Sequence, residues 1–308
     1  MADLRVALGS LTLRNPVLAA AGTFGYGLEF ARTVRLSRLG ALVTKTVTRH
    51  PRAGHPPPRL VETPSGMLNA VGLQNAGLEA FLRDTLPALR RHDVPVIVSI
   101  LSESPDELGA MAQALDEAEG VDAVELNLSC LNVTSRPGQH RRLVSHDPDA
   151  TRAMVQAAAH RTRKPLLAKL SPDVTDLAPI AQAAEGAGAS ALTVGNTFVG
   201  MSLDPATRRS RLGTLTGGLS GPAIRPLTVY RVWYTARSVG IPVIGVGGVV
   251  RAADALELLL AGAAAVGVGT AHFADPRAAL RVAEGIERYL DRQRIGSVRE
   301  LRGALHQP

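Results

Sequence analysis

Short apolar runs alternate with longer amphipathic segments along most of the chain. Most of these runs lack the apolar–polar alternation of a half-exposed strand, which is typical of parallel strands buried on both faces. Eight runs have this character and are predicted to be strands: Val17–Ala19, Ala41–Thr44, Val96–Ile100, Ala123–Asn127, Leu166–Leu170, Ala191–Val194, Val243–Val246 and Ala265–Val268.

The segments between the runs carry the signals of helix starts. Ser104-Pro-Asp-Glu107 has the spacing of a capping box, with proline at the first helical position. His146-Asp147-Pro148 is predicted to open the next helix in a similar way, and Thr175-Asp176 another. Further helices are expected over residues 79–91, 225–239, 252–261 and 277–291.

Eight strands with a helix after most of them predict an α/β fold, a (β/α)8 TIM barrel, in a single domain over residues 1–308. The alternative is an open, doubly wound sheet. Long excursions follow the second, fourth and sixth strands, at His50–Pro64, Leu131–His146 and Thr197–Gly221. All three leave the carboxyl ends of strands, so we expect long loops at the face where barrel active sites are built.

The composition fits one large domain. The chain has 308 residues, 45% of them hydrophobic, which is enough to bury an extensive core. No apolar run approaches the roughly 20 residues of a membrane span, and the N-terminus lacks the pattern of a secretory signal. With a single cysteine in addition, we expect a cytoplasmic protein with no membrane contact and no bound metal.

The basic residues are mostly arginines. The formal net charge is +7, and only three of the 34 basic residues are lysines, namely Lys45, Lys164 and Lys169. The arginines are spread over amphipathic segments and aromatic residues make up only 3%, so a nucleic-acid partner is not expected. Where arginine is the default cation, a lysine at an apolar strand end indicates a need for a compact point charge.

The last two strands end in glycine-rich segments, Gly245-Val-Gly-Gly248 and Gly267-Val-Gly-Thr270. Glycine after the seventh and eighth strands of a barrel lets backbone amides approach an anion, although a tight turn alone would also use it. The paired occurrence favours a phosphate site. No Gly-x-Gly-x-x-Gly fingerprint opens a βαβ unit, so a dinucleotide site is not predicted.

Polar side chains collect at other strand ends. Lys45 and Lys169 both lie there, where each could contact an anion or cofactor or pair with a carboxylate. Amide side chains offer a donor and an acceptor, which suits a flat heterocycle bearing carbonyl and N–H groups. Five asparagines lie in loops or at strand ends: Asn69, Asn75, Asn127, Asn132 and Asn196.

Cys130 is the only cysteine of the chain and comes just after the fourth predicted strand. A lone thiol either packs inertly or reacts. Asn127 and Ser129 surround it with hydrogen-bonding side chains, which favours a catalytic thiol.

Six motifs follow one another along the chain: Met67-Leu-Asn-Ala-Val-Gly-Leu-Gln-Asn75, Glu125-Leu-Asn-Leu-Ser-Cys130, Gly195-Asn-Thr197, Gly217-Gly-Leu-Ser-Gly-Pro-Ala-Ile224, Gly245-Val-Gly-Gly248 and Gly267-Val-Gly-Thr270. In this order they resemble the catalytic subunit of class 1 dihydroorotate dehydrogenases, most closely the B-type, NAD-linked branch. The resemblance runs from about Arg14 to Leu290.

The resemblance implies an FMN-binding barrel that oxidises (S)-dihydroorotate to orotate in pyrimidine synthesis. It assigns Cys130 as the base that removes a proton from C5, while hydride leaves C6 for flavin N5. The substrate contacts that it implies are Lys45, Asn69, Ala70, Val71, Gly72, Leu73, Asn127, Asn196 and Thr197. The implied flavin contacts are Ala21, Lys45, Thr46, Ser99, Asn127, Lys169, Gly195, Gly221, Gly247, Gly248, Gly269 and Thr270.

Four residues depart from the family pattern. Leu131 replaces a proline after the cysteine, Ala21 a serine, Ser99 an asparagine and Gly195 an aliphatic residue. The departures at Ala21, Ser99 and Gly195 affect expected flavin contacts. The loop at 136–142 also lacks the glycine-rich sequence typical of the family, and by its position we expect it to act as a mobile lid.

The resemblance also implies a homodimer joined to a second subunit, which carries FAD and a [2Fe–2S] cluster and reduces NAD. One cysteine cannot supply the four thiolates of such a cluster, so the cluster is expected only on the partner. Alternatives are a fumarate-linked A-type enzyme, another pyrimidine-ring flavoenzyme, and a Schiff-base aldolase that uses Lys169.

Overall fold

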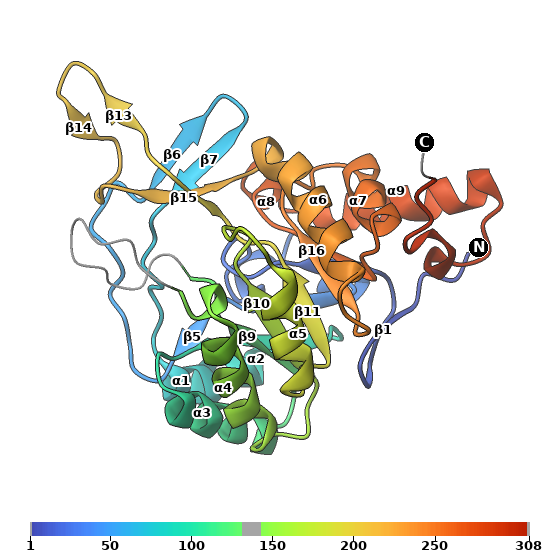
Figure 1. Ribbon diagram of the computed structural model, residues 1–308, viewed down its shortest axis with the longest axis horizontal. Coiled ribbons are helices and arrows are strands. Elements are labelled where there is room, and N and C mark those ends of the chain that lie inside the picture. Colours follow the sequence, from blue (N-terminus) through green and yellow to red (C-terminus); the bar gives the residue numbers. More distant parts are fainter. Residues whose placement is uncertain (1, 131–142, 307–308) are drawn as a thin grey trace.

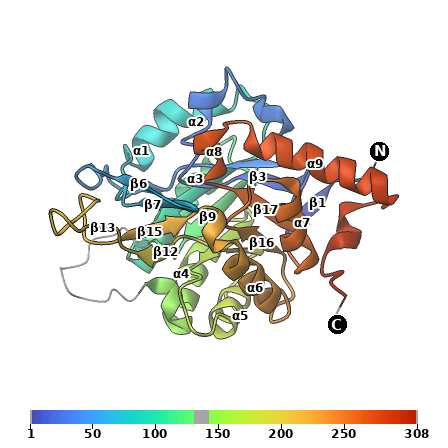
Figure 2. The same ribbon diagram turned by 90° about the horizontal axis from the view of Figure 1, so that it is seen from above.

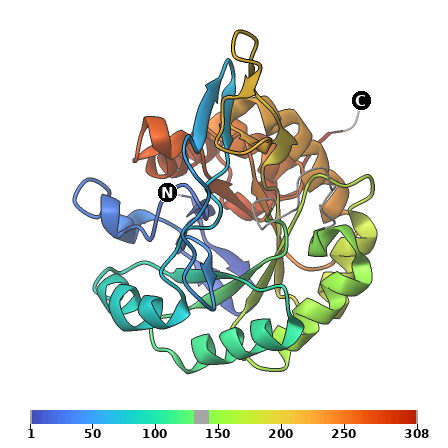
Figure 3. The same cartoon turned by 90° about the vertical axis from the view of Figure 1, so that its left-hand side faces the viewer.

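The computed structural model describes residues 2–130 and 143–306, and a closed barrel of parallel strands lies at its centre (Figure 3). β4 pairs with both β3 and β8, which closes the sheet. The (β/α)8 barrel is confirmed, and the open-sheet alternative is wrong. The barrel strands are β3 (Val17–Ala19), β4 (Ala41–Val43), β8 (Val96–Leu101), β9 (Ala123–Asn127), β10 (Leu166–Leu170), β11 (Ala191–Val194), β16 (Val243–Val246) and β17 (Ala265–Val268).

Helices surround these strands (Figure 2). The Ser104 hydroxyl accepts a hydrogen bond from the Glu107 amide, and Asp147 accepts bonds from the amides of Asp149 and Ala150, so two of the predicted helix starts are confirmed. The third predicted start leads to a helix that begins slightly later, at Ala178. The main outer helices are α3 (Pro105–Glu117), α4 (Pro148–Ala159), α5 (Ala178–Gly186), α6 (Arg225–Ala236), α7 (Ala252–Leu260) and α9 (Ala278–Gln293).

The helix expected over 79–91 is divided into three short segments. α1 (Leu78–Ala80) and α2 (Leu86–Leu89) flank a π-helical turn at Phe81–Thr85. A short helix, α8 (Ala271–Ala274), follows the last barrel strand. Short 3-10 helices occur at Leu28–Phe30, Leu36–Arg38, Val144–His146, Pro222–Ile224 and Val298–Leu301.

The strands are buried on both faces, which explains their continuous apolar sequences. Every residue of β9, β10 and β11 is buried, with the barrel interior on one side and the helices on the other. Polar residues occur within these strands at Glu125, Lys169 and Thr193. Buried charges need partners, so these positions point to an interior polar cluster below the barrel mouth.

Two of the predicted excursions form a second, antiparallel sheet rather than simple loops. Its strand order is β12–β15–β7–β6, and it projects from one end of the barrel together with a small hairpin (Figure 1). The sheet contains β6 (Leu60–Thr63), β7 (Gly66–Asn69), β12 (Phe198–Gly200) and β15 (Gly217–Ser220); the hairpin contains β13 (Leu203–Asp204) and β14 (Arg209–Ser210). β5 (Val47–Thr48) continues the second strand and pairs with β8.

The opposite end of the barrel carries the N-terminal hairpin of β1 (Val6–Leu8) and β2 (Leu11–Leu13). Gly9, at its turn, lies against Ser190, just before β11. Among the described residues, no helix is long and apolar enough to cross a membrane.

Candidate active site

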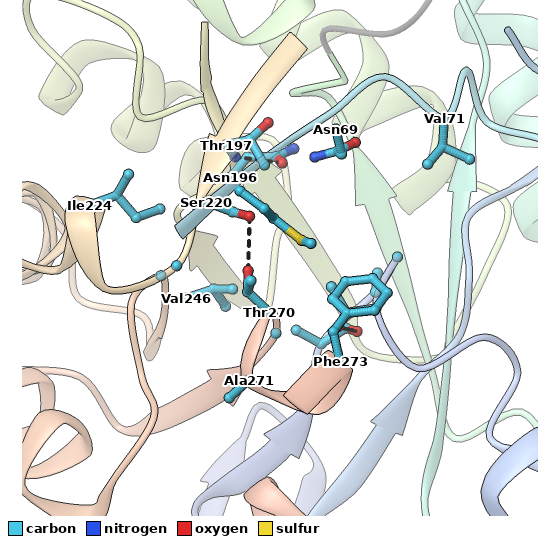
Figure 4. A pocket seen from close by; sticks show the side chains of 18 of the residues that line it. Asn69, Val71, Asn196, Thr197, Ser220, Ile224, Val246, Thr270, Ala271 and Phe273 are labelled. Carbon is cyan, nitrogen blue, oxygen red and sulfur yellow. Dashed lines mark hydrogen bonds between the residues drawn. The ribbon is translucent and has the colours of Figure 1, made fainter. Parts of the chain in front are cut away.

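One pocket lies at the carboxyl ends of the barrel strands, and the antiparallel sheet forms part of its border (Figure 4). The residues expected at the site that line it are Ala21, Lys45, Thr46, Asn69, Val71, Leu73, Asn127, Cys130, Lys169, Asn196, Thr197, Gly221, Gly247, Gly248, Gly269 and Thr270. Residues from seven barrel strand ends and from the antiparallel sheet therefore meet in one place.

Side-chain hydrogen bonds hold the segment that leads to Cys130. The Ser129 hydroxyl donates to Asn127 Oδ1 at 3.2 Å, and Asn196 Nδ2 donates to the Ser129 hydroxyl at 2.8 Å. Asn196 Nδ2 also donates to the Ser129 carbonyl at 3.2 Å. Because Ser129 is fully buried and bound from two strands, the backbone that presents the half-buried Cys130 is fixed.

The same network continues to the second and third strands. Asn127 Nδ2 donates to the Thr46 hydroxyl at 3.0 Å, and that hydroxyl lies 3.0 Å from the hydroxyl of Ser99. Ser99 is completely buried and does not line the pocket. It therefore supports Thr46 from behind.

Lys45 lies in the break between β4 and β5, where the second strand turns toward the pocket. Its amide donates to the carbonyl of Gly25 at 2.9 Å, which holds the break open. Burial lowers the pKa of Lys45, and negative charge on Cys130 acts in the opposite direction. The ammonium and the thiol therefore lie close enough to influence each other electrostatically.

Lys169 is paired below the pocket with a carboxylate. Its Nζ lies 3.9 Å from Glu125 Oε1, and the side chains are only 6% and 2% exposed. Thr193 donates to the other carboxylate oxygen at 3.0 Å. Sequence reasoning assigned no role to Glu125 or Thr193. In the sequence, the only sign of a role for Glu125 is that a charged residue stands inside an apolar strand. The structure adds that this strand, β9, pairs with β10, which carries Lys169.

Alternate residues of the 69–73 segment face the pocket. Asn69, Val71 and Leu73 line it, whereas Ala70 packs in a small cluster with Leu68 and Leu212. A Cβ on Gly72 would lie 2.5 Å from the His55 amide nitrogen, on the side away from the pocket.

Asn75 does not line the pocket. Its side chain accepts bonds from the amides of Thr48 and Gly77 and donates to the carbonyl of Leu73 at 2.7 Å. Leu73 has φ of 56°, a conformation that is uncommon for a residue with a side chain. Asn75 was expected to contact a ring ligand; instead, its side chain holds the backbone of Leu73, which lines the pocket.

We call Lys45, Asn127, Cys130 and Asn196 the side-chain wall of the pocket. The opposite border consists mainly of main chain, and we call residues 247–250 and 269–271 the backbone wall. Within the described residues, no hydrogen bond is recorded for the amides of Gly248 and Val249. A Cβ on Gly269 would meet only Thr23, at 3.8 Å, so this glycine leaves space for a ligand.

Ser220 and Thr270 connect the antiparallel sheet to the backbone wall. The Thr270 hydroxyl donates to Ser220 Oγ at 2.8 Å, the bond drawn in Figure 4. Ser220 and Phe273 line the pocket but were not expected at it. Phe273 is 52% exposed and lies in α8, whose four residues gave no helical periodicity to detect.

The structure gives a reason for the glycine at position 195. Gly195 is buried just behind the pocket with φ of 122°, and a Cβ there would lie 1.8 Å from the carbonyl oxygen of Val246. An aliphatic residue does not fit this conformation of the chain. The expectations for Leu131, Asn132 and the 136–142 loop concern residues outside those that the structure describes.

The described residues contain no group of three or more histidines, cysteines and carboxylates arranged to hold a metal ion. The described residues that line the pocket offer side-chain amides, hydroxyls, two ammonium groups, one thiol and main-chain amides.

Comparison with known proteins agrees with this chemistry. The family model described as dihydroorotate dehydrogenase matches residues 3–290. The chain is 52% identical to the "Dihydroorotate dehydrogenase B (NAD(+)), catalytic subunit" of Desulforudis audaxviator over 98% of this chain and 97% of the relative. It is 50% identical to the protein of the same name from Trichlorobacter lovleyi, over 98% of each chain.

A solved structure has a similar fold. It is described as DHODH in complex with ferulenol from Eimeria tenella, and it matches with a TM-score of 0.82 and 24% identity. The match covers 99% of this chain and 89% of that one.

Proposed function

The chain belongs to the dihydroorotate dehydrogenase family, and from this premise we propose how its pocket oxidises dihydroorotate to orotate in pyrimidine synthesis. The observation that carries the proposal is the meeting of a thiol, a partly buried ammonium and two fixed amides in one pocket, opposite a wall of open backbone. Because the chain belongs to this family, the alternative of a Schiff-base aldolase is dropped.

The family is flavin-dependent, and the residues present fit FMN. The amides of Gly248 and Val249 in the backbone wall have no hydrogen-bond partner among the described residues, and Gly269 leaves space beside them, which suits a phosphate group. The polar edge of the flavin ring needs hydrogen-bond donors, and the pocket supplies them at Lys45, Thr46 and Lys169. When bound, FMN supplies acceptance of hydride.

Oxidation removes a proton from C5 and a hydride from C6, and leaves a C5–C6 double bond in orotate. Cys130 takes the proton as its thiolate, and the ammonium of Lys45 stabilises that thiolate and the carboxylate of the substrate. Asn69, Asn127 and Asn196 orient the ring by its carbonyl and N–H groups. Supporting bonds at Ser129 keep the thiol aligned with C5.

The electrons leave through a separate electron-transfer subunit, as the names of the B-type relatives imply. We propose that this partner carries the FAD and [2Fe–2S] groups, that NAD+ is the final acceptor, and that this chain forms a homodimer. Reoxidation of the isolated, FMN-loaded chain by fumarate at a catalytic rate would favour the A-type alternative instead.

The proposal is tested with purified chain reconstituted with FMN. Addition of dihydroorotate without oxygen should bleach the visible flavin absorbance, with one orotate formed for each flavin reduced. A chain that takes up no FMN, or a loaded chain that stays oxidised, contradicts the proposal. Co-purification and light scattering then test the partner and the homodimer separately.

A further inference from the structure

A buried carboxylate lies directly behind the backbone wall and outside the pocket. Asp254, in the first turn of α7, is 1% exposed. Its Oδ2 accepts hydrogen bonds from the amides of Val250 and Arg251, at 2.9 and 2.8 Å. Its Oδ1 accepts a bond from the guanidinium of Arg225. Both carboxylate oxygens are therefore used, and both face donors.

Arg225 joins this carboxylate to the other side of the glycine turn. It is the first residue of α6, and its Nε also lies 3.4 Å from Glu257 Oε2 in α7. A Cβ on Gly248 would lie 2.4 Å from Cβ of Arg225 and 2.8 Å from its amide nitrogen. The turn at 247–248 therefore packs directly on the residue that Asp254 binds.

These contacts hold both ends of the turn. Asp254 binds the two amides that follow it, at Val250 and Arg251, and the Arg225 pair fixes the surface on which Gly248 rests. The amides of Gly248 and Val249, which have no hydrogen bond recorded among the described residues, lie between these supports. A rigid turn presents such amides to an anion without an ordering cost.

We propose that Asp254 is a positioning residue for the phosphate of FMN. Asp254 acts through the backbone of residues 247–251 and does not touch the cofactor. This inference rests on the proposed function, since it assumes FMN in this pocket. It accounts for a negative charge behind a wall that binds an anion: the charge is neutralised by Arg225 and two amides, and its effect on the site is geometric.

The substitution Asp254→Asn tests this role with little change in volume. An amide has one acceptor oxygen and one NH2 group, so it cannot accept at both positions. Either the 250–251 amides or Arg225 then faces a donor. The matched control is Asp116→Asn, which changes a carboxylate that also accepts a backbone bond, from Arg163, at the amino-terminal end of β10.

The measurement is the affinity of flavin-free protein for FMN and for riboflavin, which lacks the phosphate, by quenching of flavin fluorescence. We expect Asp254→Asn to lower the ratio of FMN to riboflavin affinity at least about tenfold, with riboflavin binding changed by less than about twofold. Asp116→Asn should keep the wild-type ratio. In the flavin-free protein, hydrogen exchange at the backbone amides of residues 247–251 should accelerate in Asp254→Asn alone, because the turn loses one of its two supports whichever way the asparagine amide is oriented.

The outcomes separate the two proposals. If the wild type prefers FMN and Asp254→Asn keeps the full preference, the positioning role is wrong and the proposed function stands. If the wild type binds both flavins equally, the phosphate site itself fails. If Asp254→Asn does not fold, Arg225→Gln removes the other half of the pair, and an unchanged affinity ratio in that variant overturns the inference.

Discussion

The side-chain wall and the backbone wall face each other across one pocket but depend on different parts of the chain. In the side-chain wall, the working atoms belong to Lys45, Asn127, Cys130 and Asn196, and side-chain hydrogen bonds among Asn127, Ser129 and Asn196 hold the two amides and the segment that leads to Cys130. In the backbone wall, the available atoms are main-chain amides, and the side chains that matter lie behind them. Chemistry and cofactor binding should therefore be separable by mutation.

Cys130→Ala should give the largest effect and should confine it to chemistry. Without the thiol no base removes the C5 proton, so flavin reduction by dihydroorotate should slow about 100-fold or more, the scale of general-base loss. FMN affinity should stay unchanged, because the backbone wall is intact. Stopped-flow absorbance of the loaded variant measures the rate, and flavin titration measures the affinity.

Cys130→Ser is the matched comparison, because a hydroxyl of similar size replaces the thiol. Because of its high pKa, almost none of this hydroxyl is ionised near neutral pH, so the rate should be low there and should recover as pH rises, which the alanine variant cannot show. Equal rates in wild type and Cys130→Ala would remove Cys130 from the mechanism.

The barrel and the side-chain wall were largely predictable from sequence. Parallel strands that are buried on both faces have unbroken apolar sequences. The eight predicted runs correspond to the eight barrel strands within a residue at each end. Polar residues that end such runs meet at the mouth because the strands are parallel, which is why Lys45, Asn127 and Cys130 come together.

The remaining features depend on contacts between distant segments. β7 pairs with β15, about 150 residues later, and neither short strand has a periodicity that differs from a loop. The supporting roles of Asn75, Glu125 and Asp254 likewise depend on which backbone groups the fold brings to them. Sequence identifies a polar residue but not the partner that makes it a support.

Gly248→Ala should show the converse effect in the backbone wall. At φ of 77° an added Cβ is strained and would press on Arg225, at 2.4 Å. The turn must move, so FMN affinity should fall at least about tenfold. At saturating FMN, the rate of flavin reduction should stay near that of the wild type.

Gly303→Ala is a suitable control for the general cost of a left-handed alanine. Gly303 has φ of 72°, and an added Cβ meets nothing within 4 Å. It should change FMN affinity little. A loss of affinity as large as that of Gly248→Ala would show that the turn has no special role, and a slowed reduction step in Gly248→Ala would show that the two walls are not separable.

The smallest effect concerns a residue under the backbone wall that the proposed chemistry does not use. His272, in α8, is 2% exposed, and its ring packs against that of Phe24 in a tilted arrangement with centroids 4.6 Å apart. Burial lowers its pKa from 6.5 to about 4, although the charge of Asp275 acts in the opposite direction.

Because the folded pKa lies below the unfolded value, the unfolded chain binds a proton first as pH falls. The contribution of neutral His272 is therefore complete above pH 6.5 and is lost as pH falls toward 4. At pH 5.5 this group alone should lower the free energy of unfolding by about 1 kcal/mol relative to pH 7.5.

His272→Leu should remove that pH dependence, whatever its effect on absolute stability at pH 7.5. Urea unfolding of the flavin-free protein at the two pH values measures the difference, and His160→Gln, at an exposed position, serves as the control. The same drop in wild type and His272→Leu would mean that His272 does not titrate between these pH values. Flavin reduction by the loaded variant should stay within about twofold of wild type, the range of a change that touches neither reacting atoms nor base, because the backbone wall acts through its amides.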